Sequence, residues 1–457
     1  MFRFFKKHTP SSLYCQTRLQ QLPVIPVKAS AYEVLERPER FHARLLTLIR
    51  EAKERIMLTV LYLQDDEAGR EILNALYEAK AKNPLLHIMV YVDYHRAQRG
   101  LIGQDKSPGN AGLYYSMAEA RQPAPAIYGV PVKKREIFGV MHLKGCVFDN
   151  TVLYSGASVN NVYLGVGGRY RLDRYHEIHS RELADTFCRY VNDAFHINLA
   201  VQDFSQGQVR PIRDIRDAQK TLRRHLTLQQ YTFRGARLKS DEVGITPVVG
   251  LGKRGNPLNR DILWMITGAA EELFICTPYF NPPKVLLGAL NDTLARGVHV
   301  TLVVGDKVAN DFYIPETEKF SAVGAVPYIY EMNLREFVAA HEKEIAEGIL
   351  NVMLWSDGTN TYHLKGLFVD RNLALVTGNN LNPRAWSLDL ENGLIVHDPH
   401  HLLQEKFMHE KQHILRHTRR IEKATDLESL EDYPEPVRKI LERVRRFRAS
   451  LVIKQLL

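Results

Sequence analysis

Apolar residues along the chain fall into short runs of strand length and longer stretches with helical spacing, and the two kinds alternate. The same succession of strand, helix and strand occurs twice, about 220 residues apart. The strands are expected at 56–63 and 87–93 in the first half and at 273–280 and 299–305 in the second, with helices between them at about 68–82 and 283–296. Because strands that alternate with helices of this length usually pair in parallel, each half is predicted to form an α/β domain.

Changes in composition divide the chain into five segments. These are a basic N-terminal segment (1–25), a first domain (26–205), a linker (206–244), a second domain (245–415) and a basic amphipathic tail (416–457). The linker contains a basic, helix-compatible stretch and is expected to pack on the surface. The tail carries seven basic residues and one acid between Val437 and Leu457, with apolar residues at helical spacing. Such a helix either lies in an anionic lipid interface or docks its apolar stripe on the domain.

Charge and hydropathy narrow the classes of protein further. The 457 residues carry 61 Lys and Arg against 52 Asp and Glu, a net charge of +9, which favours anionic partners. The four cysteines stand apart, which argues against a disulfide framework or a cysteine zinc site. No apolar run reaches the roughly 18 residues that cross a bilayer, and no signal-peptide pattern follows Met1. We therefore expect a cytoplasmic chain that is not integral to a membrane.

The two halves share a short motif of chemically active residues. His142, Lys144 and Asp149 in the first half, and His363, Lys365 and Asp370 in the second, fit the pattern H-x-K-x4-D. The two copies lie in register with the duplication. Their apolar flanks predict strands, in which alternate side chains share a face. Each His would then project beside its Lys, with the Asp near the end of the strand.

Two imidazoles and two ammonium groups that converge on one point suit a tetrahedral phosphoryl group. One His can attack phosphorus while the other protonates the leaving oxygen, and the lysines neutralise charge on the remaining oxygens. Because the lysines supply the positive charge that a metal ion supplies elsewhere, we expect no metal and no other cofactor.

The paired motifs resemble those of the phospholipase D superfamily. The resemblance implies two pseudo-twofold-related α/β domains with a single active site at their interface. Residues 378–391 look like the superfamily segment G-S-x-N-x-x-x-R…E, with Asn380 at the Asn position and Glu391 at the acid that orients a catalytic His. Asn379 departs from that pattern, where a small residue is expected. The first half matches only in part, and its acid is then Asp173.

A closer resemblance extends over residues 93–100, 154–158, 305–315 and 378–391. These segments are similar to a soluble bacterial branch of the superfamily that transfers a phosphatidyl group from CDP-diacylglycerol to L-serine. The resemblance implies that His142 is the nucleophile and that His363 acts as general acid and then as base. Lys144 and Lys365 would hold the phosphoryl oxygens, and Asp149 and Asp370 would give structural support within the catalytic set. The choice of His142 follows superfamily habit, because the symmetry permits either histidine.

Polar residues after the strands provide candidates for substrate binding. They follow the carboxyl ends of predicted strands, where ligands of open α/β sheets bind, or lie in the segments after the two motifs. The candidates are His95, Arg96, Arg99, Asn160, Asn310, Asp311, Tyr313, Asn380 and Asn382. We expect them to hold the cytidine diphosphate and the phosphoryl group. The alternative is that the charged ones are loop residues paired with each other.

Three rival interpretations remain open from the sequence. A cardiolipin-synthase-like transferase or a phospholipase would use glycerol or water as acceptor, and a superfamily nuclease would cleave nucleic acid. A basic protein that binds nucleic acid or the ribosome without catalysis would show binding that falls with salt. For the lipid enzyme we expect attachment to the inner face of the cell membrane through the basic tail, with non-specific association with polyanions or ribosomes as a further partner class.

Overall fold

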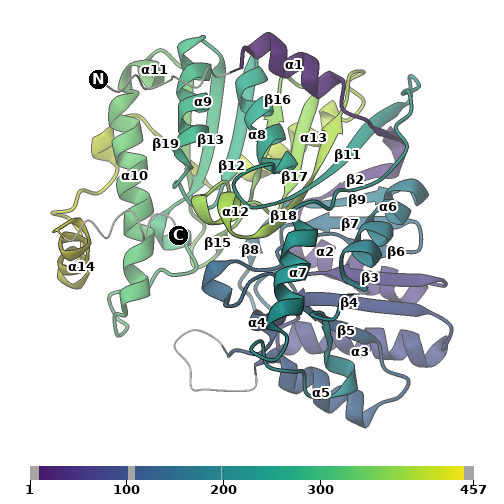
Figure 1. The fold of residues 1–457 in the computed structure, drawn as a ribbon. Coiled ribbons are helices and arrows are strands. Elements are labelled where there is room, and N and C mark those ends of the chain that lie inside the picture. Colours follow the sequence, from purple (N-terminus) through teal and green to yellow (C-terminus); the bar gives the residue numbers. More distant parts are fainter. Residues whose placement is uncertain (1–9, 101–108, 197, 447–457) are drawn as a thin grey trace.

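The computed structural model describes residues 10–100, 109–196 and 198–446, and it consists of two α/β halves that pack face to face (Figure 1). The part of the predicted tail beyond residue 446 lies outside the described residues, as do residues 1–9 of the basic N-terminal segment. No helix among the described residues is both long and apolar enough to cross a bilayer.

The first half is built on an eight-stranded mixed sheet in the order β10-β5-β4-β3-β6-β7-β9-β2. Its strands are β2 (Tyr32–Leu35), β3 (Arg55–Thr59), β4 (His87–Asp93), β5 (Ala126–Val130), β6 (Cys146–Phe148), β7 (Thr151–Ser155), β9 (Tyr175–His179) and β10 (Gln202–Asp203). The parallel pairing that the sequence predicts is found between β3, β4 and β5. The pairing of β6, β7, β9 and β2 is antiparallel, because tight turns and not helices connect β6 to β7.

The second half repeats this design in a nine-stranded sheet in the order β1-β11-β18-β17-β16-β12-β13-β14-β19. Its strands are β1 (Ile25–Lys28), β11 (Glu242–Leu251), β12 (Glu272–Thr277), β13 (His299–Gly305), β14 (Leu350–Trp355), β16 (Gly366–Val369), β17 (Leu373–Thr377), β18 (Leu390–His397) and β19 (Thr418–Ile421). Here β12, β13 and β14 are the parallel strands. A further pair, β8 (Arg171–Leu172) and β15 (Thr361–Tyr362), joins the two halves.

Helices pack against both sheets (Figure 1). In the first half and linker they are α2 (Pro38–Glu51), α3 (Glu67–Lys82), α4 (Tyr94–Ala97), α5 (Asn110–Ala120), α6 (Arg181–Val191) and α7 (Arg216–Leu226). Those on the second half are α1 (Ser12–Gln20), α8 (Pro257–Gly268), α9 (Lys284–Ala295), α10 (Val326–Ala340), α11 (Glu342–Ala346), α12 (Pro383–Ser387), α13 (Gln404–Leu415) and α14 (Glu435–Arg446). α6, α7 and α13 lie where the two halves meet, because their buried side chains belong to the cluster that joins the halves. The predicted helices at 68–82 and 283–296 correspond to α3 and α9.

Strand pairing moves three of the predicted segment boundaries. β1, placed by sequence at the start of the first domain, pairs with β11 in the second sheet. β11 itself begins at Glu242, inside the predicted linker, and β19, in the predicted tail, forms the edge of the second sheet beside β14. Short apolar runs do not reveal which sheet they join, because pairing depends on contacts far along the chain.

The described part of the tail docks on the second half. Val437 and Leu441 on α14 are buried against Tyr328 of α10 and against Tyr433. The apolar positions of this segment therefore face the protein, as in the docking alternative, and not a lipid phase.

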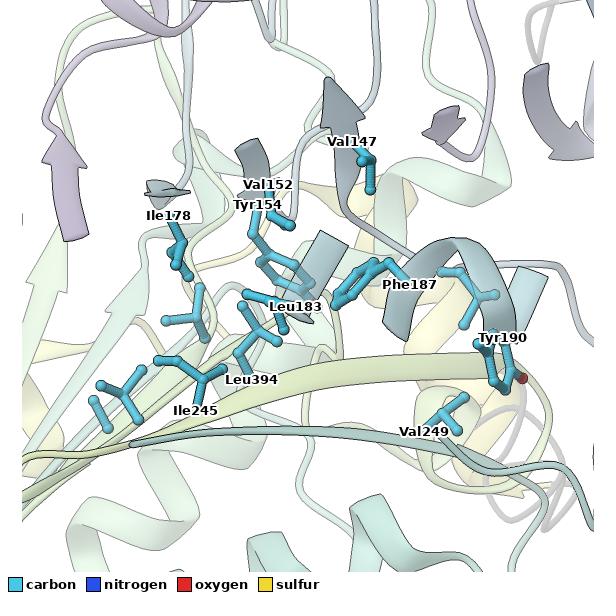
Figure 2. Close-up of a cluster of buried hydrophobic side chains, with 14 of the residues drawn as sticks. Val147, Val152, Tyr154, Ile178, Leu183, Phe187, Tyr190, Ile245, Val249 and Leu394 are labelled. Atoms are coloured by element: carbon cyan, nitrogen blue, oxygen red, sulfur yellow. The ribbon is translucent and has the colours of Figure 1, made fainter. Parts of the chain in front are cut away.

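A continuous hydrophobic cluster joins the two halves (Figure 2). Val152 and Tyr154 of β7 and Phe187 of α6 meet Val249 of β11 and Leu394 of β18. All five side chains are almost fully buried. Burial of this kind is the main favourable term in domain association, so the two halves are held in one fixed relation.

Candidate active site

The two His-x-Lys segments lie in extended chain directly before β6 and β16, and not inside strands as predicted. β6 runs antiparallel to β3 with Cys146 opposite Leu58, so its beginning lies at the carboxyl end of β3. β16 has the same relation to β12. The glycines that follow the two lysines, Gly145 and Gly366, have φ values of 110° and 136°, a region that favours glycine. The chain turns at these glycines, which explains why both motifs contain one.

Backbone hydrogen bonds join each motif to the opposite half of the chain. The amide of His142 donates to the carbonyl of Leu390 in the second half at 2.9 Å, and the amide of His363 donates to the carbonyl of Leu172 in the first half at 2.9 Å. Each histidine is therefore held against the strand that carries the acid of the other half. These two reciprocal hydrogen bonds give the site its pseudo-twofold character.

The side chains follow the same crossed arrangement. Nδ1 of His142 lies 2.9 Å from both oxygens of Glu391, and Nδ1 of His363 lies 3.3 Å from Oδ2 of Asp173. Each acid thus orients the imidazole of the opposite half through Nδ1, which leaves Nε2 as the ring nitrogen available to react. The two acids singled out in the sequence are brought to the two histidines.

The two lysines are buried beside the imidazoles but have different partners. Nζ of Lys365 donates to Oδ2 of Asp173 at 2.8 Å and contacts Nδ1 of His363. Nζ of Lys144 donates to Oγ of Ser158 at 3.4 Å. The Lys365 ammonium is therefore paired with a carboxylate, whereas the partner of the Lys144 ammonium is a hydroxyl.

Burial and the cluster of cations set the protonation of the site. Burial lowers the pKa of His142 well below its usual range, and the ammonium groups of Lys144 and Lys365 lower it further. The same two effects lower the pKa of His363 to about 4, the cation there being Lys365. Burial and Lys365 together lower the pKa of Lys144 to about 8. Near neutral pH the histidines are thus free bases able to attack or to accept a proton.

The pKa values of the two acids are shifted in opposite directions. Burial raises the pKa of Glu391 well above its usual range. Burial also acts to raise the pKa of Asp173, but Lys365 and His363 outweigh it and hold that pKa below its usual range. The two half-sites therefore differ in the electrostatics of the acid that faces the imidazole.

Asp149 and Asp370, the last residues of the motifs, lie at strand starts away from the imidazoles. The Asp149 carboxylate accepts hydrogen bonds from the amides of Lys53, Glu54 and Arg55 at 2.8–3.0 Å. Asp370 does the same for the amides of residues 270–272. Both carboxylates therefore cap the start of a central strand, β3 or β12. They have a structural position and make no contact with the reacting groups.

Of the candidate loop residues after β4, two are already engaged. Arg99 forms a two-pronged ion pair with Glu136, with Nη2 and Oε1 2.7 Å apart. Nε2 of His95 is 2.7 Å from the carbonyl oxygen of Lys133. Arg96 differs, because it is buried with its guanidinium 4.3 Å above the Tyr62 ring, and its Nη1 has no hydrogen-bond partner among the described residues. Arg96 therefore remains the best candidate of the three for an anionic substrate group.

The candidate asparagines mostly support turns. Asn160 accepts from the amide of Tyr163, and Asn382 accepts from the amide of Ala385 at the start of α12, both at 2.9 Å. Asn310 accepts from the amide of Phe312 at 2.9 Å. Asn380 is different, since its buried Oδ1 has no hydrogen-bond partner among the described residues.

The two remaining candidates, Tyr313 and Asp311, lie in different surroundings. Tyr313 packs toward Tyr328 beside the docked tail. Asp311 instead forms an ion pair with Arg171 across the two halves, with 2.6 Å between Oδ1 and Nη2.

Several residues at the site were not singled out from the sequence. Tyr163 has its hydroxyl 2.9 Å from Nδ1 of His363, and the Tyr279 ring lies edge-on to the same imidazole. Arg171 and Ser158 complete this set. One signal was present, because Arg171 and Asp389 are charged residues that stand two positions before the two acids.

No group of three or more His, Cys, Asp or Glu side chains is arranged to hold a metal ion in the ranges that the structure describes.

Comparisons with known proteins agree with this geometry. A family model described as "Cardiolipin synthase, PLD-like domain" matches residues 45–194 and 262–415. A CDP-diacylglycerol–serine O-phosphatidyltransferase of Haemophilus influenzae is 44% identical, covering 97% of this chain and 98% of that protein. The corresponding Escherichia coli enzyme is 43% identical over 97% of this chain and 98% of its own length. The crystal structure of the Haemophilus influenzae phosphatidylserine synthase superposes with a TM-score of 0.95 at 43% identity, covering 98% of this chain and 100% of that one.

Proposed function

Because this chain belongs to the phospholipase-D-like family, in the branch of the CDP-diacylglycerol–serine O-phosphatidyltransferases, we propose that it makes phosphatidylserine and CMP from CDP-diacylglycerol and L-serine. The observation that carries the chemistry is the pair of imidazoles, each bonded through Nδ1 to the acid of the other half. Such a pair can move one phosphoryl group from one oxygen to another through a covalent intermediate, with one imidazole bonded to phosphorus and the other serving both oxygens on the opposite face.

The first step forms a covalent intermediate. Nε2 of His142 attacks the phosphorus that carries the diacylglycerol, a nitrogen–phosphorus bond forms, and the bond from that phosphorus to the CMP oxygen breaks. His363 gives its proton to the departing CMP. Although its pKa is low, the negative diphosphate raises it on binding, because an opposite charge favours the charged imidazolium.

The second step uses the same groups in reverse. His363, now neutral, removes the proton from the serine hydroxyl, and that oxygen attacks the phosphatidyl group on His142. The nitrogen–phosphorus bond breaks and phosphatidylserine leaves. Lys144 and Lys365 neutralise the charge that develops on the non-bridging oxygens in both steps. The assignment of His142 as nucleophile follows the resemblance to the superfamily, because the symmetry of the site permits either histidine.

The experiment that tests this function measures CMP release from CDP-diacylglycerol in detergent micelles with EDTA, with and without L-serine. We expect serine-stimulated CMP release with phosphatidylserine formed, and loss of both in His142→Asn. CMP release that glycerol or water supports equally well would instead favour a cardiolipin-synthase-like transferase or a phospholipase. Absence of turnover on lipid together with cleavage of DNA or RNA would favour a nuclease.

We also propose that the protein works from the cytoplasmic side, attached to anionic phospholipid at the inner face of the membrane. Ile137 and Phe138 support this attachment, because both are half exposed on the segment before the first motif. A neighbouring groove is lined by Lys133, Lys134, Lys220, Arg223 and Arg224. Apolar side chains flanked by cations suit a headgroup layer. Arg384 donates to the carbonyls of Glu136 and Ile137, which ties this surface to the active-site segment 378–391.

The positive charge of the tail supports the same membrane attachment. With Val437 and Leu441 docked on the protein, its contribution would come from exposed cations such as Lys439 and Arg443. A net charge of +9 also supports weak, salt-sensitive association with polyanions such as ribosomes.

A further inference from the structure

Arg171 and Asp311 form an ion pair between the two halves of the chain, next to His363 but outside the catalytic set. Nη2 of Arg171 and Oδ1 of Asp311 are 2.6 Å apart, and their side chains keep 15% and 19% exposure. Arg171 comes from β8 in the first half, and Asp311 from the loop that follows β13 in the second. The pair is therefore sheltered but still reachable.

Each member of the pair is separated from the His363 ring by one tyrosine. The Arg171 guanidinium lies 4.7 Å above the ring of Tyr163, whose hydroxyl is 2.9 Å from Nδ1 of His363. The hydroxyl of Tyr279 is 3.4 Å from Oδ2 of Asp311, and its ring centroid is 6.1 Å from that of His363. A small molecule held by the pair would consequently lie beside the histidine that activates the acceptor.

The other acids near the reacting groups are committed elsewhere. Asp173 and Glu391 bind the two imidazoles, and Asp389 is ion-paired with Arg384 at 3.1 Å. Asp311 differs from these three acids, because its ion-pair partner, Arg171, is itself a candidate for binding the substrate.

The pair also breaks the pseudo-twofold symmetry of the site. Arg171 stands two positions before Asp173, and at the matching place two positions before Glu391 the chain has an acid, Asp389. The charge at equivalent positions is therefore reversed. The surroundings of the two histidines therefore differ, and the charged pair stands on the side of His363, the histidine that activates the acceptor.

We propose that Arg171 and Asp311 form the binding site for the α-carboxylate and α-ammonium groups of the amino-acid acceptor, and so select serine. An amino acid carries both charges on one carbon, so its recognition requires an arginine and a carboxylate side by side, as they are here. Arginine has five N–H donors in a planar fork. In Arg171, Nε donates to Oγ1 of Thr361, and Nη2 faces Asp311 as an ion pair in which the Asp311 Oδ1 has no hydrogen-bond partner among the described residues. The amino acid exchanges the existing ion pair for two new ones, which leaves the net charge of the site unchanged.

The test compares acceptors that lack one of the two charges, and it rests on the proposed function. Phosphatidyl transfer is measured with L-serine, with ethanolamine, which lacks the carboxylate, and with 3-hydroxypropionate, which lacks the ammonium group. The ratio of kcat/KM between acceptors is independent of the amount of folded enzyme. In Arg171→Met we expect the preference for serine over ethanolamine to fall at least about 30-fold. In Asp311→Asn the preference for serine over 3-hydroxypropionate should fall to a similar degree.

Matched variants separate recognition from structure. Arg169→Met removes an exposed arginine two positions away and should leave both ratios unchanged. Arg171→Lys retains the charge and should recover part of the serine preference. Unchanged ratios in Arg171→Met and Asp311→Asn, or an increase in the KM for CDP-diacylglycerol in place of that for serine, would overturn the assignment. Wild-type enzyme that makes no phosphatidylserine would contradict the proposed function itself, which is a different outcome.

Discussion

His142 and Glu391 are 249 residues apart in the chain, yet the imidazole Nδ1 lies 2.9 Å from both carboxylate oxygens. The contact joins the two halves, and His363 and Asp173 form its counterpart in the opposite direction. Neither histidine takes its acid from its own half. The reacting centre therefore depends on the docking of the two sheets as much as on the motifs themselves.

The order of the two histidines can be tested by single-turnover kinetics. We expect His142→Asn to lose CMP release by at least about a thousandfold, because no nitrogen remains to attack phosphorus. His363→Asn should lose steady-state turnover by about a hundredfold or more but still release up to one equivalent of CMP, since a phosphate leaving group with a pKa of about 6 needs little acid assistance. Intact mass spectrometry should then detect the phosphatidyl adduct. A burst in His142→Asn and not in His363→Asn would reverse the assignment.

The pH profile should show the titration of Lys144. Its pKa of about 8 lies below the usual lysine value, so the ammonium group is lost as the pH rises through 8. We expect kcat/KM, which reports the free enzyme, to fall above pH 8. Saturating CDP-diacylglycerol should move this limb to higher pH, because the phosphate anion favours the ammonium form. Lys144→Arg should abolish the limb, whatever its effect on rate, and a limb that persists would assign it to another group.

Asp370 should matter for stability and not for chemistry. Asp370→Ala removes the acceptor for the amides of residues 270–272, and we expect the free energy of unfolding to fall by about 2–3 kcal/mol. Activity per folded molecule should stay within about twofold of wild type. Asp173→Asn provides the contrast, since it should abolish turnover through His363. A large loss of kcat in folded Asp370→Ala would restore a catalytic role to the last residue of the motif.

A second buried ion pair between the halves should dominate their stability. Arg174 bonds Glu410 of α13 through Nε at 2.7 Å and the carbonyl of Leu375 through Nη1 at 2.7 Å, and both ion-pair side chains are buried. Glu410→Gln leaves the arginine charge uncompensated, so unfolding should become easier by about 3–5 kcal/mol in urea titration. The exposed partner of Lys220, Asp217, serves as control, and Asp217→Asn should give no measurable change.

Membrane attachment can be tested at the exposed segment before the first motif. Replacing Ile137 and Phe138 by Ser should weaken sedimentation with vesicles that contain anionic phospholipid, because about half of each side chain is available to enter the headgroup layer. Activity on short-chain, soluble substrate should be retained. Leu85 is a matched control, since it is 85% exposed and lies just before the amino end of β4, an inner strand of the sheet. Equal loss of binding in Leu85→Ser would contradict the assignment of this surface.

The sequence predicted the parallel strands and both motifs because local periodicity and spacing carry that information. β4 and β13 begin and end where the apolar runs do. Lys144, His363 and Lys365 all lie close enough to His142 for their charges to lower its pKa. Tyr163 and Arg171 were not predicted, since they come from an irregular stretch with no period. The sequence also could not show that Glu391 pairs with His142, because this contact depends on how the two sheets dock. Arg99 was predicted to bind substrate, but its guanidinium is ion-paired with Glu136.

The hydrogen bonds from His142 to Leu390 and from His363 to Leu172 have a consequence for the origin of such a protein. A single half would contain a histidine without the acid that orients it, and as a monomer it would be inactive at any concentration. Two identical halves could complete each other, but only as a dimer whose activity varied with concentration. Duplication within one polypeptide removes that dependence on assembly. It also frees the two copies to diverge, so that one can come to carry the covalent intermediate and the other to handle the departing nucleotide and the incoming alcohol in turn.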